Sequence, residues 1–349
     1  LAQIGYILLG AGFSTHAGLT ASVTHMFNHA LAKGALFLAL AGMAMHVKQL
    51  LFKDIGGIGR RMPWTTAAFV IAGASLVGIP GTAGFVSKWL LLQAAFDQGW
   101  LGLVAVVVVV LSSLAAVYYV WRIIEQAYFG EPAEGYTEGE APWPLLAGLW
   151  LVAIANIYFG LAPQLACRHQ SAGVGAAMSP ENTILLALVL PLIGAVGIGL
   201  AGRWPNLRET VTLVTSVSLA LLVWSLAPVV MAGGRPGVVV TEVFGELSLA
   251  FSVEPLGMLF GALAATLWIV NSIYSIGYMR GNNEKNQTRF YICFAIAISA
   301  ALGVAFADNL LTLFLCYEIL TLSTYPLVSH KGDEATIRSA RVYLGILLG

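Results

Sequence analysis

Three titratable side chains follow one another at four-residue spacing in an otherwise apolar stretch, residues 24–42: His25, His29 and Lys33. On an α-helix this spacing places them one turn apart, on a single slowly drifting stripe. A neutral imidazole can accept and pass on a proton near pH 7. A charge inside lipid is costly, so the stripe indicates a proton or ion path. The competing interpretation is two satisfied core histidines and a lysine that reaches toward the membrane surface.

A second candidate site is the sequence GIPGTAGFVSKWLLL, near residues 78–92. Pro80 removes a helical hydrogen bond. Three glycines loosen the same backbone: Gly78, Gly81 and Gly84. The pattern predicts a discontinuous helix, the kind of element that forms ion sites in transporters. Lys88 lies about one turn into the second half-helix, where the positive end of the helix dipole disfavours an ammonium group. We therefore expect a lysine that switches its charge; the alternative is an ordinary loop between two helices.

Glu318 is the third candidate, because it lies near the middle of the apolar stretch 308–328. A lone carboxylate in lipid is costly unless it is protonated or paired. This favours a proton-carrying group, and the alternative is a neutral glutamic acid that holds two helices together by hydrogen bonds. The expected relay has five members: Glu318, Lys88, Lys33, His29 and His25.

The remaining histidines raise the alternative of a haem-binding membrane electron carrier. His16 and His46 fall near the ends of expected helices and are most simply interfacial. A haem held by two histidines needs them on facing helices, whereas His25 and His29 share one helix. The sequence contains no nucleotide-binding, zinc-ribbon or metalloprotease motif. We expect no catalytic residue, no metal site and no cofactor in this chain.

The composition places the chain in a membrane. Of its 349 residues, 58% are hydrophobic and 10% are charged, and the mean hydropathy is +0.84. Soluble domains carry about 25% charged residues, so the lipid bilayer must be the solvent for most of this surface. Seventeen basic and seventeen acidic residues balance, which leaves no electrostatic footprint for binding nucleic acid.

The expected fold is all-α, a polytopic bundle of about twelve transmembrane spans that are partial at both ends of the chain. The spans are 1–13, 18–46, 64–79, 84–97, 101–128, 144–165, 183–202, 209–231, 255–278, 290–307, 308–328 and 336–349. Residues 237–253 alternate like a short β-hairpin outside the lipid. Both termini fall inside apolar runs, so we expect a fragment or a fusion.

Loop charges orient only part of this bundle. In the second half, Arg203, Arg280 and Lys331 fall on one side, which the positive-inside rule assigns to the cytoplasm. In the first half, the same counting of spans puts the basic segment 48–61 outside and the acidic segment 131–142 inside. The two halves therefore disagree.

The motifs resemble one family. AQIGYILLGAG, HMFNHALAKGALFLALAG and GIPGTAGFVSKWLLLQAAF resemble the antiporter-like membrane subunits shared by respiratory complex I, Mrp-type sodium/proton antiporters and membrane-bound hydrogenases. LFLCYEILTLSTYPLV resembles the glutamate-bearing helix of that family. The resemblance implies inverted five-helix repeats around a polar axis. It also implies that Glu318 lies where protons come in, that the His25–His29–Lys33 stripe is the central relay, and that Lys88 lies near the far half-channel.

The order of these motifs differs from the order in the family. There the glutamate helix is the fifth, and the relay and broken helix are the tenth and twelfth. The resemblance thus implies that residues 1–177 correspond to the C-terminal part of one subunit, about helices 9–14. Residues 178–349 correspond to the N-terminal part of a second, about helices 1–6. The central lysines of the family's seventh and eighth helices are absent, so a structural membrane scaffold without a complete path is an alternative.

The function implied by the resemblance is translocation of protons, or of sodium against protons, within a multisubunit antiporter or a respiratory or hydrogenase complex. The partners would be other membrane subunits, in a prokaryotic inner membrane. The stretch YEILTLSTYP slightly favours the D-type member of the Mrp antiporter branch or the hydrogenase branch. Any catalysis would belong to the whole complex, as in a translocase of the NADH:quinone oxidoreductase type.

Overall fold

Helices make up about four fifths of the part of the chain that the computed structural model describes: residues 2–47, 51–131, 139–161, 178–244, 247–330 and 334–348. Within these residues, eight helices are long and apolar enough to cross a membrane, and three shorter apolar helices accompany them. The expected all-α, polytopic fold is confirmed. The chain divides into two compact units, Leu1–His169 with Ile273–Asn282, and Gln170–Ser272 with Asn283–Gly349.

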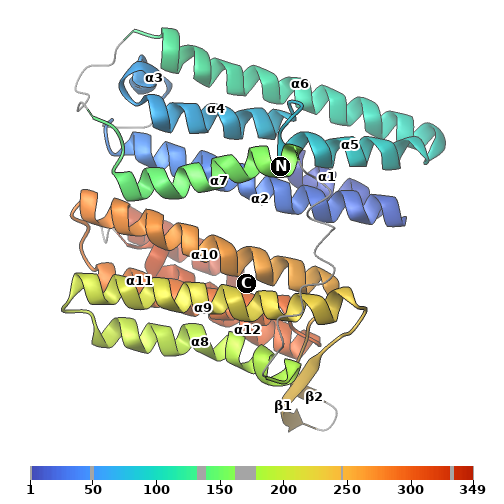
Figure 1. The fold of residues 1–349 in the computed structure, drawn as a ribbon, viewed down its shortest axis with the longest axis vertical. Coiled ribbons are helices and arrows are strands. Elements are labelled where there is room, and N and C mark those ends of the chain that lie inside the picture. Colours follow the sequence, from blue (N-terminus) through green and yellow to red (C-terminus); the bar gives the residue numbers. More distant parts are fainter. Residues whose placement is uncertain are drawn as a thin grey trace. The chain divides into compact units, whose positions relative to one another are not determined.

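The first unit, which contains α1 to α7 (Figure 1), holds most of the candidate residues. Its elements are α1 (Ala2–Gly12), α2 (His16–Ala44), η1 (Phe52–Ile55), α3 (Ile58–Arg61), α4 (Pro63–Val77), α5 (Ala83–Phe96), α6 (Gly99–Phe129) and α7 (Trp143–Leu161). The hydroxyl of Thr15 caps α2 by accepting a hydrogen bond from the amide of Gly18 at 3.1 Å. The valine-rich run of α6 is helical, since a backbone in lipid must satisfy its own hydrogen bonds.

The expected discontinuous helix is confirmed as the pair α4 and α5, which are separated by residues 78–82. The two halves lie end to end in Figure 1, and α2, α6 and α7 each contact both of them. Segments 64–79 and 84–97, which the sequence count treats as separate spans, therefore form one broken helix.

This pairing corrects the orientation of the first half. An oxygen of the Glu140 carboxylate accepts a hydrogen bond from the amide of Trp64 at 2.9 Å. The start of α4, which follows the basic loop, thus touches the residue that precedes α7. The described parts of the basic loop (51–62) and of the acidic loop (139–142) lie at the same end of the unit. The sequence count was wrong here because it took one broken helix for two spans.

The second unit is built from α8 (Pro180–Leu200), α9 (Pro205–Met231), β1 (Gly237–Phe244), β2 (Leu247–Ser252), α10 (Pro255–Gly281), α11 (Gln287–Ala305), α12 (Leu310–Val328) and α13 (Glu334–Leu348). The last residues of α10 group with the first unit. The helix start expected at Ser179-Pro180-Glu181 is confirmed, because the Ser179 hydroxyl caps α8.

The expected β-hairpin is also confirmed, and it is tied to the corner between α11 and α12. Its strands pair antiparallel. The amide of Ala250 donates to the hydroxyl of Thr312 at 3.1 Å, and the side-chain amide of Asn309 donates to the carbonyl of Ser248 at 2.8 Å. These bonds hold the hairpin against the start of the helix that carries Glu318.

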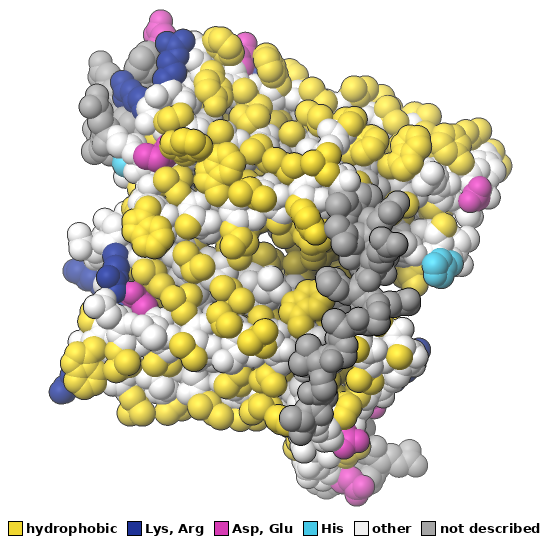
Figure 2. All heavy atoms as spheres, viewed as in Figure 1, with side chains coloured by type: hydrophobic (Ala, Val, Ile, Leu, Met, Phe, Trp, Pro, Cys, Tyr) yellow, Lys and Arg dark blue, Asp and Glu magenta, His cyan; other side chains and the backbone are white. Residues whose placement is uncertain are grey.

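Hydrophobic side chains dominate the visible surface of α6 in Figure 2. Many large hydrophobic residues of α6 are well exposed, among them Val104, Leu111 and Leu114. An exposed apolar face of this length fits contact with lipid or with another membrane helix.

Candidate functional site

His25 is the centre of a buried polar cluster in the first unit. It lies on α2, is 2% exposed, and has partners on two other helices. Its Nδ1 lies 2.9 Å from the hydroxyl oxygen of Ser87 on α5, and its Nε2 lies 3.0 Å from the side-chain carbonyl oxygen of Gln3 on α1. A carbonyl oxygen only accepts, so Nε2 carries a hydrogen and, in the neutral ring, Nδ1 accepts one.

The hydroxyl of Ser87 can serve both protonation states of His25. It lies 2.9 Å from His25 Nδ1 and 3.2 Å from the carbonyl oxygen of Gly84. When the imidazole is neutral, the hydroxyl donates to Nδ1. When it is protonated, Nδ1 donates to the hydroxyl, which then donates to Gly84. Rotation about one C–O bond therefore accommodates the gain or loss of a proton.

The other members of the predicted stripe differ from each other. The ring of His29 stacks on that of His25, with ring centres 6.1 Å apart and planes 9° apart. Lys33 instead has an exposed side chain, and its Nζ lies 5.6 Å from the centre of the Phe37 ring. A four-residue step overshoots one helical turn by roughly 40°. Two such steps carry Lys33 off the buried face that His25 occupies.

Lys88 is buried beside the break, on the first turns of α5. Its ammonium group donates three hydrogen bonds, to the carbonyls of Leu76 at 3.0 Å and Val77 at 2.9 Å and to the hydroxyl of Ser113 at 3.0 Å. It also lies 5.3 Å from the centre of the Tyr6 ring. All three acceptors are neutral.

The carbonyls of Leu76 and Val77 belong to the last turn of α4, which is the negative end of that helix dipole. The ammonium group of Lys88 is therefore stabilised by the first half-helix. The sequence reasoning considered only the positive end of α5 and expected the opposite influence. The spacing within α5 does not show that the Lys88 side chain reaches back across the break to the carbonyls of Leu76 and Val77.

Gly78 makes this arrangement possible. Its φ is +90°, a conformation that side-chain-bearing residues rarely adopt, and a Cβ there would lie 3.0 Å from Cδ of Lys88. Gly81 has the same φ, but its Cβ would meet nothing closer than 3.9 Å. Gly84 opens α5 and donates its amide to the hydroxyl of Ser75 at 3.0 Å. Pro80 lies exposed in the loop between the half-helices.

Two hydroxyls on α6 complete the cluster and were missed by the sequence reasoning. Ser113 accepts from Lys88, and Ser112 is hydrogen-bonded to the phenol of Tyr6. The signal was present in the sequence as two adjacent serines in the middle of a valine- and leucine-rich run. Asn28, also unpredicted, donates from α2 to the carbonyl of Ala83 at 2.6 Å and fixes the start of α5.

Glu318 belongs to the second unit, where it lies half-buried on α12. Within the described residues it has no hydrogen bond or ion pair. The first unit thus brings together His25, His29 and Lys88, and the predicted carboxylate lies in the other unit.

The second unit has a buried polar cluster of its own. Arg208 is 4% exposed and lies in the first turn of α9. Its guanidinium donates to the carboxylate of Glu209 at 3.4 Å and to the side chain of Gln287 at 2.7 Å. The cluster fastens the start of α9 to the start of α11.

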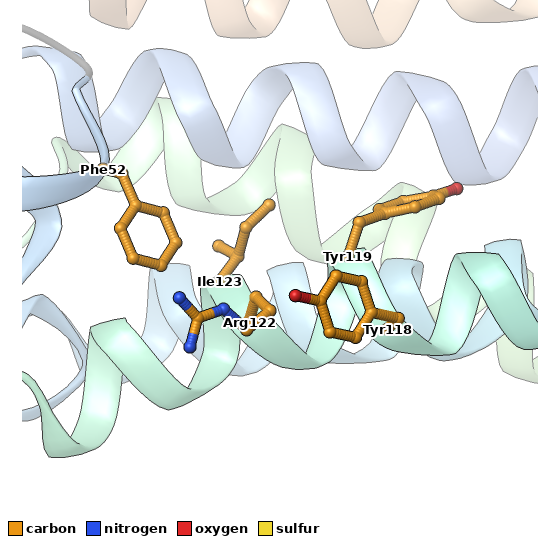
Figure 3. A pocket seen from close by; sticks show the side chains of 5 residues that line it. All are labelled: Phe52, Tyr118, Tyr119, Arg122 and Ile123. Carbon is orange, nitrogen blue, oxygen red and sulfur yellow. The ribbon is translucent and has the colours of Figure 1, made fainter.

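A shallow pocket of about 350 Å³ lies elsewhere in the first unit (Figure 3). In Figure 3 the guanidinium of Arg122 points toward the ring of Phe52, whose centre is 5.4 Å away. Arg122 also pairs with Glu125 at 3.2 Å. The other lining residues are Tyr118, Tyr119 and Ile123. None of the relay candidates lines this pocket. In the described part of the chain, no group of three or more histidine, cysteine or acidic residues could hold a metal ion.

Comparison with known proteins gives this cluster a context. Residues 1–114 match the family model described as "NADH:quinone oxidoreductase/Mrp antiporter, TM". This segment contains α1 to α5, the first half of α6 and every member of the polar cluster around His25 and Lys88. The resemblance seen in the sequence motifs is confirmed by this match.

Relatives extend the similarity beyond the matched segment. The chain is 40% identical over 146 residues to NADH-quinone oxidoreductase subunit N of Desulforudis audaxviator, which covers 41% of this chain and 28% of that protein. It is 30% identical over 305 residues to F(420)H(2) dehydrogenase subunit L of Methanosarcina mazei, covering 83% of this chain and 40% of that protein. A third relative is NADH-quinone oxidoreductase subunit L of Mycobacterium tuberculosis, 31% identical over 169 residues, 46% of this chain and 26% of that protein.

The chain therefore spans well under half the length of these relatives, 40% at most. Each relative is named as a subunit. The family match and the eight apolar helices of the described residues together show that the chain is an integral, multi-pass membrane protein.

Proposed function

We propose, from the match of residues 1–114 to the NADH:quinone oxidoreductase/Mrp antiporter family model, that the chain translocates protons, or sodium against protons, across a membrane. It does so as one part of a multisubunit antiporter or of a respiratory or hydrogenase complex. The observation that carries the proposal is the buried Lys88, whose ammonium group is held by the carbonyl end of a broken helix and has no carboxylate among its hydrogen-bond acceptors.

The proposed chemistry rests on His25 and Lys88, two proton-carrying groups that both lie beside Tyr6. The ring of Tyr6 lies 5.3 Å from the ring of His25 and 5.3 Å from Nζ of Lys88. Two positive charges so close in a low-dielectric interior repel each other. A proton that arrives at one group therefore favours release from the other. The Ser87 hydroxyl accommodates the change at His25 by rotating, and the neutral acceptors around Lys88 allow it to lose its proton without stranding a buried carboxylate.

Glu318, His29 and Lys33 extend the proposed relay beyond this pair. His29 continues the stack of imidazoles. Lys33 faces outward on the described chain, so we assign it the transfer of charge to a neighbouring membrane subunit. Glu318 is proposed to supply protons within the second unit. The proposed location is a prokaryotic inner membrane.

The two-part organisation is proposed on the same basis. Residues 1–177 would be the C-terminal part of one antiporter-like subunit, and residues 178–349 the N-terminal part of another. The division of the chain into compact units between residues 169 and 170 supports this boundary, and the family match lies wholly in the first part.

The alternative functions make different predictions. A scaffold without its own path would tolerate loss of Lys88. A haem-binding carrier would show the visible absorption of haem. It is disfavoured by His25, because both ring nitrogens already have hydrogen-bond partners.

Proton flux in membrane vesicles that contain the chain in its native complex tests the proposal. Lys88→Met keeps the length of the side chain and removes the proton-carrying group. Lys285→Met, at an exposed lysine between α10 and α11, is the matched control. We expect a pH-sensitive dye to report lost flux in the first variant and normal flux in the second. Normal flux in both would favour the scaffold.

A further inference from the structure

We infer that Glu140 is a positioning residue for Lys88. It fixes the N-terminus of α4, the helix whose opposite end holds the Lys88 ammonium group. The inference rests on the proposed function only where it concerns proton flux, because the geometric relation between the two residues can be tested separately.

The N-terminus of α4 lacks a cap of its own. The residue at the capping position is Met62, which makes no side-chain hydrogen bond to the helix, and Pro63 follows it. The carboxylate of Glu140 takes over this role from a segment more than seventy residues later in the chain. One of its oxygens accepts from the amide of Trp64 at 2.9 Å, and the other accepts from the hydroxyl of Thr65 at 2.5 Å. Such contacts satisfy amide and hydroxyl groups that otherwise lack acceptors at a helix start.

Close packing holds this carboxylate in place. Ala141, the next residue, is 4% exposed, and its amide donates to the Glu140 carboxylate at 3.1 Å. Gly42 lies near the end of α2, and a Cβ there would come within 3.3 Å of both Ala141 and Thr65. Helices α2 and α4 and the segment leading into α7 therefore meet at this point, next to the half-buried Glu140. Glu140 ties the start of α4 to the other two elements.

The opposite end of α4 is the site of Lys88. The carbonyls of Leu76 and Val77 in its last turn accept two of the three hydrogen bonds that the ammonium group donates. Trp64 and Val77 are thirteen residues apart, which corresponds to about 20 Å of helix. An acid at the positive end of α4 and an ammonium at its negative end both suit the dipole of the helix.

The break at residues 78–82 leaves α4 dependent on its own contacts. In a continuous transmembrane helix, the turns before and after any residue help to fix its position along the axis. Helix α4 ends at the break and has only 15 residues. Its position along its own axis depends on the packing of its sides and on the anchor at its start. Loss of the Glu140 anchor frees the first turn and lets the carbonyls at the far end move away from Lys88.

Three variants separate this role from a general effect of charge. Glu140→Ala removes the anchor. Glu140→Gln keeps the shape and one acceptor oxygen but removes the charge. Glu125→Gln is the matched control, because Glu125 lies toward the end of α6 in the same unit and pairs with Arg122 rather than with α4.

The first readout is the ¹⁵Nζ resonance of Lys88 in lysine-labelled protein in lipid, assigned by its disappearance in Lys88→Met. We expect this resonance to move in Glu140→Ala, to move less in Glu140→Gln, and to stay in place in Glu125→Gln. An unchanged Lys88 resonance in Glu140→Ala overturns the inference, whatever happens to proton flux. If Glu140→Ala does not fold, Glu140→Gln carries the same test.

The second readout is proton flux in vesicles. A lost helix cap is worth about 0.5–2 kcal/mol, which at 1.4 kcal/mol per tenfold gives a decrease of about two- to thirty-fold. We expect Glu140→Ala to lower flux within that range and Glu125→Gln to leave it at the parent level. An equal loss of flux in both variants contradicts a role particular to Glu140. If Lys88→Met itself leaves flux intact, the proposed function fails. The Lys88 ¹⁵Nζ resonance in Glu140→Ala still tests whether Glu140 positions Lys88.

Discussion

A pair of glycine variants isolates the contact between Gly78 and Lys88. Gly78→Ala and Gly81→Ala introduce the same methyl group at the same backbone φ, since both residues have φ of +90°. A side-chain-bearing residue in the left-handed region costs about 1–2 kcal/mol. Both variants should therefore lose a similar, moderate part of the free energy of unfolding.

Only one of the two disturbs the lysine. The new Cβ at position 78 would lie 3.0 Å from Cδ of Lys88, whereas at position 81 the nearest atom is 3.9 Å away, an ordinary contact. The lysine side chain must yield by several tenths of an ångström. Its hydrogen bonds to the two carbonyls, now 3.0 and 2.9 Å long, then stretch toward the limit of useful geometry. Hydrogen bonds of a charged group are worth about 1.5–3 kcal/mol each, so flux should fall by about tenfold or more.

The assay pairs chemical unfolding in detergent with proton flux in vesicles. We expect the two variants to have similar unfolding midpoints and only Gly78→Ala to have low flux. Equal flux in the two variants would refute the assignment of the carbonyl end of α4 as the holder of Lys88.

Three further predictions concern stability. Burial lowers the pKa of His330, although Glu284 acts in the opposite direction. The unfolded chain therefore binds a proton at this residue more readily than the folded chain does. As a result, the contribution of His330 to the free energy of unfolding is most favourable above the ordinary imidazole pKa of about 6.5 and is lost as the pH falls below it. Thermal unfolding of His330→Asn at about pH 8 and pH 5 should show a smaller pH dependence than the parent, and an unchanged dependence would contradict this. Arg208→Met should destabilise by about 1–3 kcal/mol in denaturant titration, since it removes a buried guanidinium that bonds both Glu209 and Gln287. No measurable loss would contradict a stabilising role for this cluster. Asn28→Ala should cost about 0.5–1.5 kcal/mol in the same titration, because it removes a buried hydrogen bond between α2 and the start of α5. No loss of stability would contradict this contribution.

The sequence alone predicted the membrane fold, the β-hairpin and the broken helix, because each depends on local pattern: apolar length, alternation, and glycine with proline. It also predicted that His25 and His29 lie together, since they are neighbours on one helix. Lys33 shows the limit of such reasoning. Its four-residue spacing fits the stripe, but each step turns the side chain further around the helix. Whether Lys33 is then exposed depends on which helices cover that side of α2.

Long-range contacts explain what the sequence reasoning missed. Lys88 is held by carbonyls of another half-helix, and the spacing within its own helix gives no sign of that. Glu140 reads as one more acid in an exposed loop until the structure places it on the amide of Trp64. Ser112 and Ser113 carried a visible signal, two hydroxyls in an apolar helix, whose partners only the packing of α1 and α5 against α6 reveals.

The correction of the span count also changes the orientation inferred for the first unit. With α4 and α5 as one span, the arginines Arg60, Arg61 and Arg122 lie toward one end of that unit, and the positive-inside rule favours the cytoplasm for that end. The described residues of the acidic loop lie at the same end.

The central claim is that Lys88 gives up and regains a proton, and a comparison of Lys88→Arg with Lys88→Met in the flux assay tests it most directly. An arginine keeps a positive charge at the carbonyl end of α4 but does not release its proton at any accessible pH. We expect proton flux to be lost in both variants, although the arginine variant retains the charge. Flux near the parent level in Lys88→Arg would contradict the claim and would reduce Lys88 to a fixed charge that holds the broken helix together.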